Sequence, residues 1–377
     1  MRTLLLLAIA LGCAAQQDDP AAAIAPLAAA GNASYLRGDY EAARQSFAKA
    51  WELAQQTAPD NPARYDVLKR LTSVRAAAGE FAEADNYLLI ALDWRETILG
   101  PADPKIAEDL VLSISLCRAM KDYPRALAIL NRVIALHARA SGYQSAAVAD
   151  DYSRMAQIYL EQQKPDLAEG ALTAALGIRT KAAGPLDPSL IYDLDRLGTV
   201  YITLRAYDKA EEVYRHALVI RDTLYGKVHA DLLATVDGLA YALFGQKKYD
   251  EAEPVYQRLV ALWQSSVGEN HPMLAIALDK VAVFYAGQKK YDQAREAGER
   301  ANAIRAYCLA NGLSVEAAEQ MSEGHQDATV ALLRRALQVL DPPHPVYDEL
   351  RAQTEKIVKC LAPPAEPARK GPPKKKP

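Results

Sequence analysis

The sequence predicts an all-α protein, an α-α superhelix of about eight helical hairpins followed by a C-terminal capping helix. One motif, an aromatic residue followed by Asp, one further residue and Ala, begins at Tyr207, Tyr249 and Tyr291, 42 residues apart each time. Self-similarity at a fixed period is the signature of repeat architectures. The 377-residue chain is rich in good helix formers, has almost no β-branched runs, and is too long for one ordinary compact core.

The motif continues upstream in the same phase, and two further markers keep the same period. Gly suits the end of a helix and Pro the first position of the next one. We therefore expect each unit to hold two helices with a tight inner turn, and a Gly…Pro connector to the next unit. The motif begins at Tyr40, Phe81, Tyr123, Pro165, Tyr207, Tyr249 and Tyr291; the glycines are Gly100, Gly142, Gly184, Gly226 and Gly268; the prolines are Pro62, Pro104, Pro188 and Pro272.

Apolar residues inside the units are spaced as on one face of a helix. Leu194, Leu197 and Tyr201 follow the i, i+3, i+7 pattern. Small residues such as Gly198 and Ala240 recur where two helices must approach closely, and larger side chains fill the space beside them. This spacing supports packed pairs of helices.

The period, the connector Gly-x-x-His-Pro at residues 268–272 and the paired tyrosines resemble the tetratricopeptide repeat family, and within it the kinesin-light-chain type. The resemblance covers about residues 25–310, over which seven units keep phase. It implies a solenoid whose first helices line a concave groove that binds another molecule. The eight residues beyond the usual 34 add about one turn to each helix.

Both ends depart from the regular pattern. Pro165 replaces the aromatic residue of the motif, which leaves the inner turn of that unit in question. We expect a linker at 16–24, the repeat array at 25–340 with a shorter eighth unit at 313–340, and a capping helix within 341–360. That helix should turn Tyr347, Leu350 and Ile357 inward. Residues 361–377 are rich in Pro and Lys and too polar to pack, so we expect them to be disordered.

Residues 1–15 have the layout of a secretory signal, with a charged start, an apolar run at Leu4–Leu11 and small residues after it. The run is far shorter than the ~20 residues that span a bilayer. Cleavage after Ala15 would remove Cys13. The segment Ala10–Cys13 also resembles a bacterial lipoprotein cleavage box, which would leave Cys13 lipidated and the protein tethered to a membrane surface. Both alternatives predict an exported protein, either periplasmic or membrane-anchored.

Charge and motifs exclude several functions. The net charge is −3, but outside Arg2 and the tail 361–377 the chain holds 38 cations against 46 anions. An acidic body argues against nucleic acid as a partner. The sequence has no metal-ligand pair, phosphate-binding loop or dinucleotide fingerprint, and its adjacent acidic pairs do not share a helix face. We predict no enzymatic activity, no metal and no cofactor.

The resemblance places the first helix of each unit on the groove. Asp195, Asp237 and Asp279 then occupy one inward-facing position of three successive units, where kinesin light chains carry Asn. A carboxylate accepts hydrogen bonds but cannot donate them, so this row would favour peptide N–H groups, Lys or Arg. The alternative is a solvated helix face without a binding role. Further groove positions in the same phase are Tyr192, Thr199, Tyr241, Phe244, Arg118, Ser153 and Gln157.

The function predicted on these grounds is a non-catalytic scaffold that holds a protein or an extended peptide in its groove. A structural component of an envelope complex, binding through its convex face, is the alternative. The cationic tail could lie on anionic lipid, fold back onto the acidic body, or only aid solubility.

Overall fold

A computed structural model of the chain describes residues 20–361, in which helices are joined by turns and no strand is present. This confirms the all-α prediction. The signal region with Cys13, residues 16–19 of the linker, and the tail from residue 362 lie outside the described residues. The helices are α2 (Pro20–Leu36), α3 (Tyr40–Ala54), α4 (Pro62–Ala77), α5 (Phe81–Leu99), α6 (Ile106–Ala119), α7 (Tyr123–Ser141), α8 (Ala146–Glu161), α9 (Pro165–Ala183), η1 (Pro188–Leu190), α10 (Ile191–Thr203), α11 (Tyr207–Tyr225), η2 (Ala230–Leu232), α12 (Leu233–Gly245), α13 (Tyr249–Val267), α14 (Pro272–Gly287), α15 (Tyr291–Ser322), α16 (Gln326–Val339) and α17 (Asp348–Leu361).

Each predicted motif marks the first residue of the second helix of a hairpin, from α3 to α15. Five of these helices end at the predicted connector glycines, whose φ angles run from 77° at Gly226 to 95° at Gly184. Glycine adopts this left-handed backbone without strain, so it ends the helix there. Pro62 and Pro272 begin α4 and α14, and Pro188 begins η1, whereas Pro104 stays in the turn before α6.

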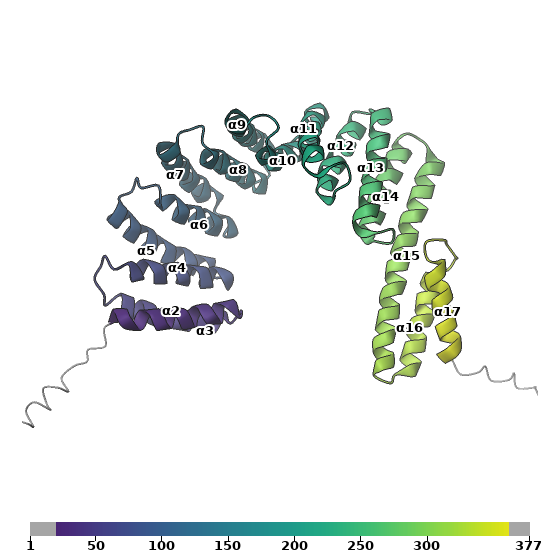
Figure 1. Cartoon of the computed structure of the whole chain (residues 1–377), viewed down its shortest axis with the longest axis horizontal. Coiled ribbons are helices and arrows are strands. Elements are labelled where there is room, and N and C mark those ends of the chain that lie inside the picture. The colour runs from purple at the N-terminus through teal and green to yellow at the C-terminus, as the bar shows by residue number, and fades with distance from the viewer. Residues whose placement is uncertain (1–19, 362–377) are drawn as a thin grey trace, which may run out of the picture. The chain divides into compact units, whose positions relative to one another are not determined.

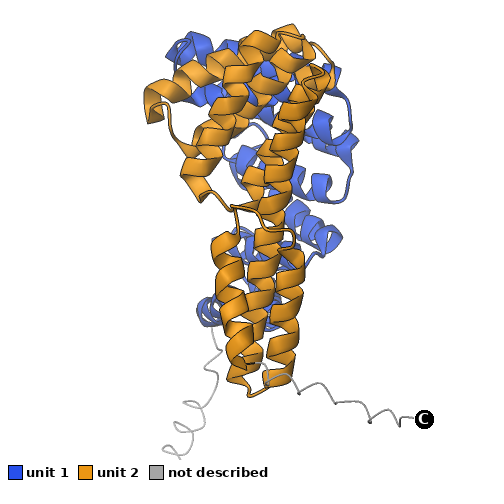
Figure 2. Ribbon diagram, turned by 90° about the vertical axis from the view of Figure 1, so that its right-hand side faces the viewer, with its two compact units in different colours: residues 1–200 blue, residues 201–377 orange. Residues whose placement is uncertain are grey.

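The chain divides into two compact units, residues 1–200 and 201–377, with the division inside α10 (Figure 2). In unit 1 the hairpins follow one another in chain order, with α4, α6 and α8 along one side of the stack and α5, α7 and α9 along the other (Figure 1). In unit 2 the same alternation of helices runs from α11 to α14 and is followed by α15, α16 and α17. We refer to α4, α6, α8, α10, α12 and α14 as the first helices.

Interlocking of large and small side chains forms the core of each unit. In unit 1, Leu88, Ile106 and Leu130 are fully buried among α5, α6 and α7. In unit 2, the ring of Tyr214 on α11 covers Gly238 on α12 so closely that a Cβ at this glycine would lie 2.3 Å from the ring. Only glycine permits this approach of the two helices.

The ends of the array differ in detail from the expectation. Residues 20–24, expected in the linker, belong to α2, and their Ala-rich sequence favours a helix. Helix α15 runs unbroken through residues 291–322, because no Gly–Pro connector follows Arg305; its second half pairs with α16 to form the eighth hairpin. Tyr347 is buried as predicted, but Ile357 of α17 is exposed, since no described segment packs on its side of the helix.

The inner turn of the hairpins repeats one backbone conformation. Its left-handed position is occupied by glycine in the first two hairpins and by longer side chains in the next five, with φ between 58° and 61°. Pro165 does not alter this turn, and it becomes the first residue of α9. A side chain with a Cβ is strained there by ~1–2 kcal/mol. The residues are Gly38, Gly79, Lys121, Gln163, Arg205, Lys247 and Lys289.

We expect Lys247→Gly to stabilise the protein by about 1 kcal/mol, because glycine relieves the left-handed strain. The reciprocal variant Gly79→Lys should lose a similar amount, since no atom lies within 4 Å of the added Cβ and only the backbone term changes. Urea unfolding followed by circular dichroism measures both. A less stable Lys247→Gly variant would show that contacts of the lysine side chain outweigh the strain.

Candidate functional site

The first helices present two rows of side chains, seven residues apart on each helix and repeated every 42 residues. A spacing of seven is close to two helical turns, so both rows lie on one face. All of these residues are exposed except Gln157, which is half-buried. We call them the first-helix face: Asp66, Glu108, Asp150 and Tyr192 with Ser73, Ser115, Gln157 and Thr199 in unit 1, and Ala234 and Ile276 with Tyr241 and Val283 in unit 2.

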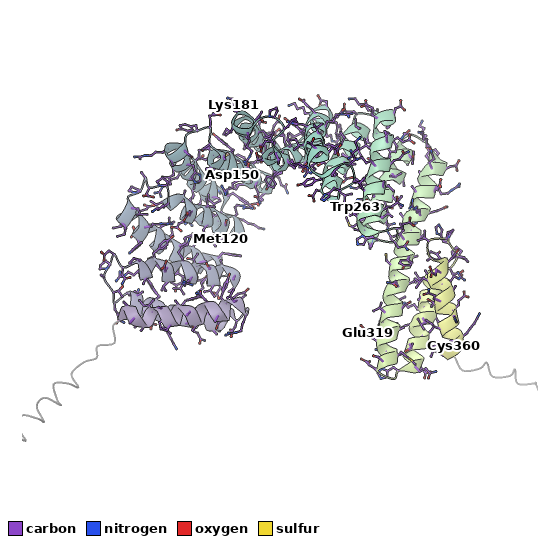
Figure 3. The ribbon with its side chains drawn as sticks, in the orientation of Figure 1. Met120, Asp150, Lys181, Trp263, Glu319 and Cys360 are labelled. Atoms are coloured by element: carbon purple, nitrogen blue, oxygen red, sulfur yellow. The ribbon has the colours of Figure 1, made fainter. Side chains whose placement is uncertain are left out.

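The two units differ in the chemistry of this face. Unit 1 presents three carboxylates, three hydroxyl groups and an amide, with Tyr192 as its one large ring, whereas unit 2 presents only apolar and aromatic side chains at the same positions. Asp150 on α8 belongs to the face, and Lys181 on α9 lies on the opposite side of the same hairpin (Figure 3).

Three of the predicted unit 1 residues form polar contacts on this side of the stack. Arg118 of α6 is ion-paired with Glu161 of α8, with its Nε 3.1 Å from Glu161 Oε2. Gln157 donates to the same carboxylate over 3.4 Å. Tyr192 is exposed, and the Arg196 guanidinium lies 5.1 Å from the centre of its ring. Tyr192 is thus accessible, whereas Arg118 and Gln157 are half-buried.

The other unit 1 residues of the prediction are less accessible. Ser153 is buried, and its hydroxyl donates to Asp193 over 2.7 Å, because this position of α8 faces α10 instead of solvent. The Thr199 hydroxyl is exposed and donates to the backbone carbonyl of Asp195 over 3.0 Å. Asp195 itself is half-buried. The structure therefore removes Ser153 from the accessible face.

In unit 2 the predicted carboxylates are already paired with cations. Lys280 Nζ lies 2.5 Å from Asp237 Oδ2, and Arg305 is ion-paired with Asp279. The cation that pairs with Asp237 of α12 comes from α14, the next first helix, and the cation that pairs with Asp279 of α14 comes from α15, the next helix in the chain. The expectation of a row of open acceptors is thus corrected to a row of partly exposed ion pairs.

The two predicted aromatic residues of unit 2 behave differently. Tyr241 is exposed, with its ring edge on Tyr207 at a centroid distance of 6.3 Å. Phe244 is half-buried, 6.1 Å from the Phe284 ring, and it covers Gly287. Phe244 therefore serves the packing of α12 on α14 and contributes little to an accessible groove.

A set of buried carboxylates, which the sequence reasoning missed, joins successive hairpins of unit 1. Asp109, Asp151 and Asp193 are fully buried at one position of three first helices. Each contacts a cationic or titratable side chain 14 residues upstream, near the end of the preceding second helix. The pairs are Arg95 Nη1 to Asp109 Oδ2 at 2.8 Å, His137 Nδ1 to Asp151 Oδ2 at 2.6 Å and Arg179 Nε to Asp193 Oδ2 at 2.9 Å.

Further donors complete these contacts, as buried charges require. Lys69 Nζ and the Tyr65 hydroxyl lie 2.6 Å and 2.9 Å from Asp109, so that side chains of α4, α5 and α6 meet at one carboxylate. Burial, together with the hydrogen bond to Asp109, raises the pKa of Tyr65. Burial also raises the pKa of Asp151, against the opposing effect of His137. The repeating Arg or His and Asp, 14 residues apart, was a readable signal in the sequence.

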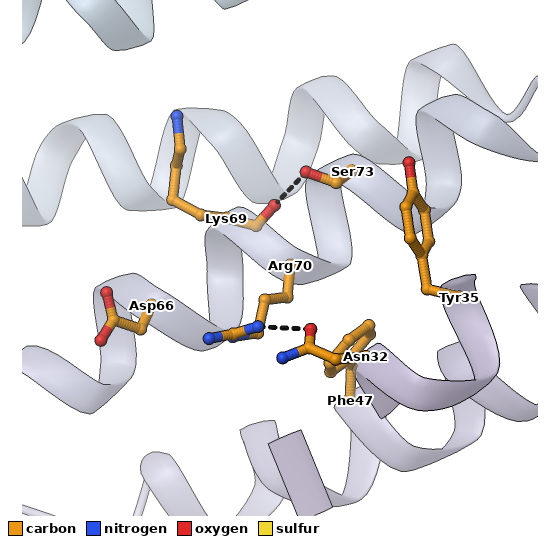
Figure 4. Close-up of a pocket in the computed structure, with 7 residues that line it drawn as sticks. All are labelled: Asn32, Tyr35, Phe47, Asp66, Lys69, Arg70 and Ser73. Atoms are coloured by element: carbon orange, nitrogen blue, oxygen red, sulfur yellow. Dashed lines mark hydrogen bonds between the residues drawn. The ribbon is translucent and has the colours of Figure 1, made fainter. Parts of the chain in front are cut away.

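A cavity of about 340 Å³ opens beside the first-helix face at the start of unit 1 (Figure 4). The Arg70 guanidinium is hydrogen-bonded to the Asn32 side chain across it, and Ser73 donates to the Lys69 carbonyl over 2.9 Å. The sequence reasoning missed this cavity, because α2 lacks the markers of the later units. Its lining residues are Asn32, Tyr35, Phe47, Asp66, Lys69, Arg70 and Ser73.

Two other kinds of site are absent from residues 20–361. No cluster of His, Cys, Asp and Glu there has the arrangement of a metal site. None of the helices in that range combines the length and the apolar character that crossing a membrane requires.

These features define a class of protein, a helical-repeat scaffold with an exposed face on its first helices. The tetratricopeptide repeat profile matches residues 110–181, 151–223 and 231–306, which together make up half of the chain. The chain belongs to the tetratricopeptide repeat family. Such proteins are generally non-catalytic scaffolds for protein–protein interaction.

The chain is similar to several solved structures. The C-terminal part of a TPR repeat-containing protein from Cytophaga hutchinsonii is 15% identical, with a TM-score of 0.53, over 73% of this chain and 93% of that one. TPR-like repeats assigned to a kinesin light chain of Podosopora anserina are 19% identical, with a TM-score of 0.48, over 54% and 96%. BtubC from P. vanneervenii is 19% identical, with a TM-score of 0.48, over 63% of this chain and 91% of that one. No curated protein sequence matches the chain.

Arg179→Met should destabilise the protein by about 3–5 kcal/mol, because it leaves the buried Asp193 carboxylate without its cation. The matched control is Arg221→Met, one period later. Arg221 donates to the neutral Thr235 hydroxyl over 2.6 Å, so its substitution leaves no buried carboxylate without a cation at this position and should cost less than Arg179→Met. Urea unfolding gives both values. Equal losses would show that the charge on the buried partner does not matter.

A second set of contacts makes unit 2 sensitive to acid. Burial alone would raise the pKa of Glu211, but hydrogen bonds from Lys248, Arg215 and Gln246 outweigh it and lower this pKa to about 2. The stabilisation by these bonds is present above the ordinary pKa of 4.5 and is lost as the pH falls towards about 2. Glu211→Gln should therefore flatten the loss of stability over this range, measured by urea unfolding at several pH values. The exposed neighbour Glu212 provides the control variant Glu212→Gln, whose pH profile should match that of the wild type.

Proposed function

We propose that this protein is a non-catalytic scaffold that binds a protein or an extended peptide through the exposed rows of its first helices, each unit by its own part of the first-helix face. The observation that carries the proposal is the pair of exposed rows, which repeat with the fold and yet change from polar to apolar between the units. Side chains that only keep a helix soluble would be polar in both units. Exposed apolar groups flanked by ion pairs are typical of a surface that is covered in a complex.

The contacts of each unit indicate what that unit would bind. Val283 and Tyr241 are 60% and 47% exposed on α14 and α12, beside the Asp237–Lys280 ion pair, and fit apolar anchors of a partner. In unit 1, Glu108 and Asp150 are ion-paired with Arg95 and Arg179 at 3.5 Å and 2.7 Å, but their side chains are 75% and 50% exposed. Together with the exposed Asp66 they fit Lys, Arg or peptide N–H groups, since carboxylates only accept hydrogen bonds. The rigid helices would lose little conformational entropy on association.

We further propose that the protein is exported and works in the bacterial envelope, either free in the periplasm or tethered through a lipidated Cys13. The signal-like residues 1–15 support this location. Mass analysis of the mature N-terminus tests it: a lipid-modified Cys13 supports the anchor, a start at residue 16 supports the free form, and an intact Met1 contradicts export.

A second candidate is a structural role through the side of the stack formed by the second helices. Helix α5 exposes Leu89, Ile90, Ile98 and Leu99. Beside it lies a cavity of about 400 Å³ whose lining includes Trp51 and Trp94. A partner that needs these residues and ignores the first-helix face would favour this role.

Val283→Ser should weaken a peptide ligand selected from a random display library by about tenfold, as expected for the loss of an interface anchor. Val219 on α11 is 52% exposed and away from the face, so Val219→Ser is the matched control and should bind as the wild type does.

Asp237→Ala should weaken binding by about 1 kcal/mol and leave the melting temperature nearly unchanged, because an exposed ion pair adds little stability. Fluorescence anisotropy with the labelled peptide gives the affinities.

The same variants separate the two candidates. A ligand that tolerates Val283→Ser and Asp237→Ala but is lost with Ile98→Lys would contradict the first proposal and support the second.

A further inference from the structure

An apolar groove remains uncovered at the C-terminal end of unit 2. It has a volume of about 330 Å³ and lies between α15 and α17, over α16. Met321 and Ile357 are 43% and 46% exposed on its two walls. In a repeat array each apolar surface is covered by the next element, and the last one needs a cap.

The chain itself leads into this groove. Leu361, the last described residue, forms part of the lining, and its carbonyl accepts a hydrogen bond of 2.8 Å from Gln326 Nε2. This bond fixes the point where the chain leaves α17, at the same end of the groove as Met321. Sixteen residues follow Leu361 in the sequence, and they begin Ala-Pro-Pro-Ala-Glu-Pro-Ala. We propose that residues 363–367 lie in the groove and cap the array.

The length of this segment fits the groove. The α15 wall extends from Asn311 to Met321, about 15 Å at 1.5 Å per helical residue. Residues in the polyproline conformation advance about 3.1 Å each, so about five of them cover that length. Residue 362 remains to turn the chain back from Leu361, and the cations from Arg369 onwards lie beyond the far end.

The chemistry fits as well. Proline has no N–H group, so a proline-rich segment leaves few donors without partners in a groove between helices. The groove walls carry amide groups at Asn311 and Gln353 that can donate to the carbonyls of the segment. Proline rings and alanine methyl groups supply apolar surface that can cover the exposed side chains of Met321 and Ile357. An extended polyproline segment is also pre-ordered, so it loses little entropy on docking.

Oxidation of methionine by hydroxyl radicals, read by mass spectrometry on the full-length chain, tests the cap. Met321 and Met273 have similar exposure in residues 20–361, 43% and 37%, and Met273 on α14 serves as the internal reference. Because oxidation follows exposure, a docked tail should slow Met321 about fivefold relative to Met273. Replacing Pro363, Pro364 and Pro367 together by Ser should restore equal rates. Replacing Lys374, Lys375 and Lys376 by Ser should leave the protection in place.

Several outcomes would overturn the cap. One is equal oxidation of Met321 and Met273 in the wild type. Another is a ratio that does not respond to the proline substitutions. Protection that increases with protein concentration would show that a second copy of the chain covers the groove. Protection that is lost only in the lysine variant would show that the contact is driven by charge. Either result contradicts the proposal.

Discussion

The contact on which unit 1 most depends is the buried carboxylate that each of three first helices offers to the preceding hairpin. Asp109, Asp151 and Asp193 have no exposed surface, and each is held by a side chain from the end of the helix before it. Apolar packing alone tolerates sliding of one helix on another. A desolvated charge does not, because leaving its partner costs several kcal/mol. These contacts therefore fix the register of one hairpin on the next and hold the exposed rows in line.

Much of the fold could be predicted from the sequence because the period is marked by residues with local conformational roles. The connector glycines end helices, and the motif at Tyr40, Tyr123 or Tyr207 begins the second helix of a hairpin wherever it occurs. Local chemistry decides these features, so no knowledge of tertiary contacts is needed. The same reasoning fails at α15, where the absence of a connector lets two helices fuse into one of 32 residues.

The candidate site was harder to predict, because the same residue type serves two purposes on one helix. Asp193 and Asp195 are two positions apart, and the first is buried while the second is half-buried. A charge can be buried only if a partner from another hairpin compensates it, here Arg179. The sequence of a single helix does not show that such a partner exists. Ser153 was placed on the groove for the same reason, although its hydroxyl completes the Asp193 contact. The pairing of Asp237 with Lys280, 43 residues apart, escapes such a reading as well.

On the proposed function, the repeats divide their positions between folding and recognition. At the buried positions unit 1 repeats the same chemistry, with an Asp on each of three first helices and Arg or His opposite it. At the exposed positions, seven residues apart, the chemistry changes from Asp150 and Gln157 on α8 to Ile276 and Val283 on α14. The exposed positions contribute less to the joining of hairpins: Glu108 pairs with Arg95 at 3.5 Å while its own side chain is 75% exposed, and Tyr241 contacts Tyr207. A chain built in this way can change its partner without changing its fold, which is why the family is recognisable here while the ligand must be sought in the side chains that do not repeat.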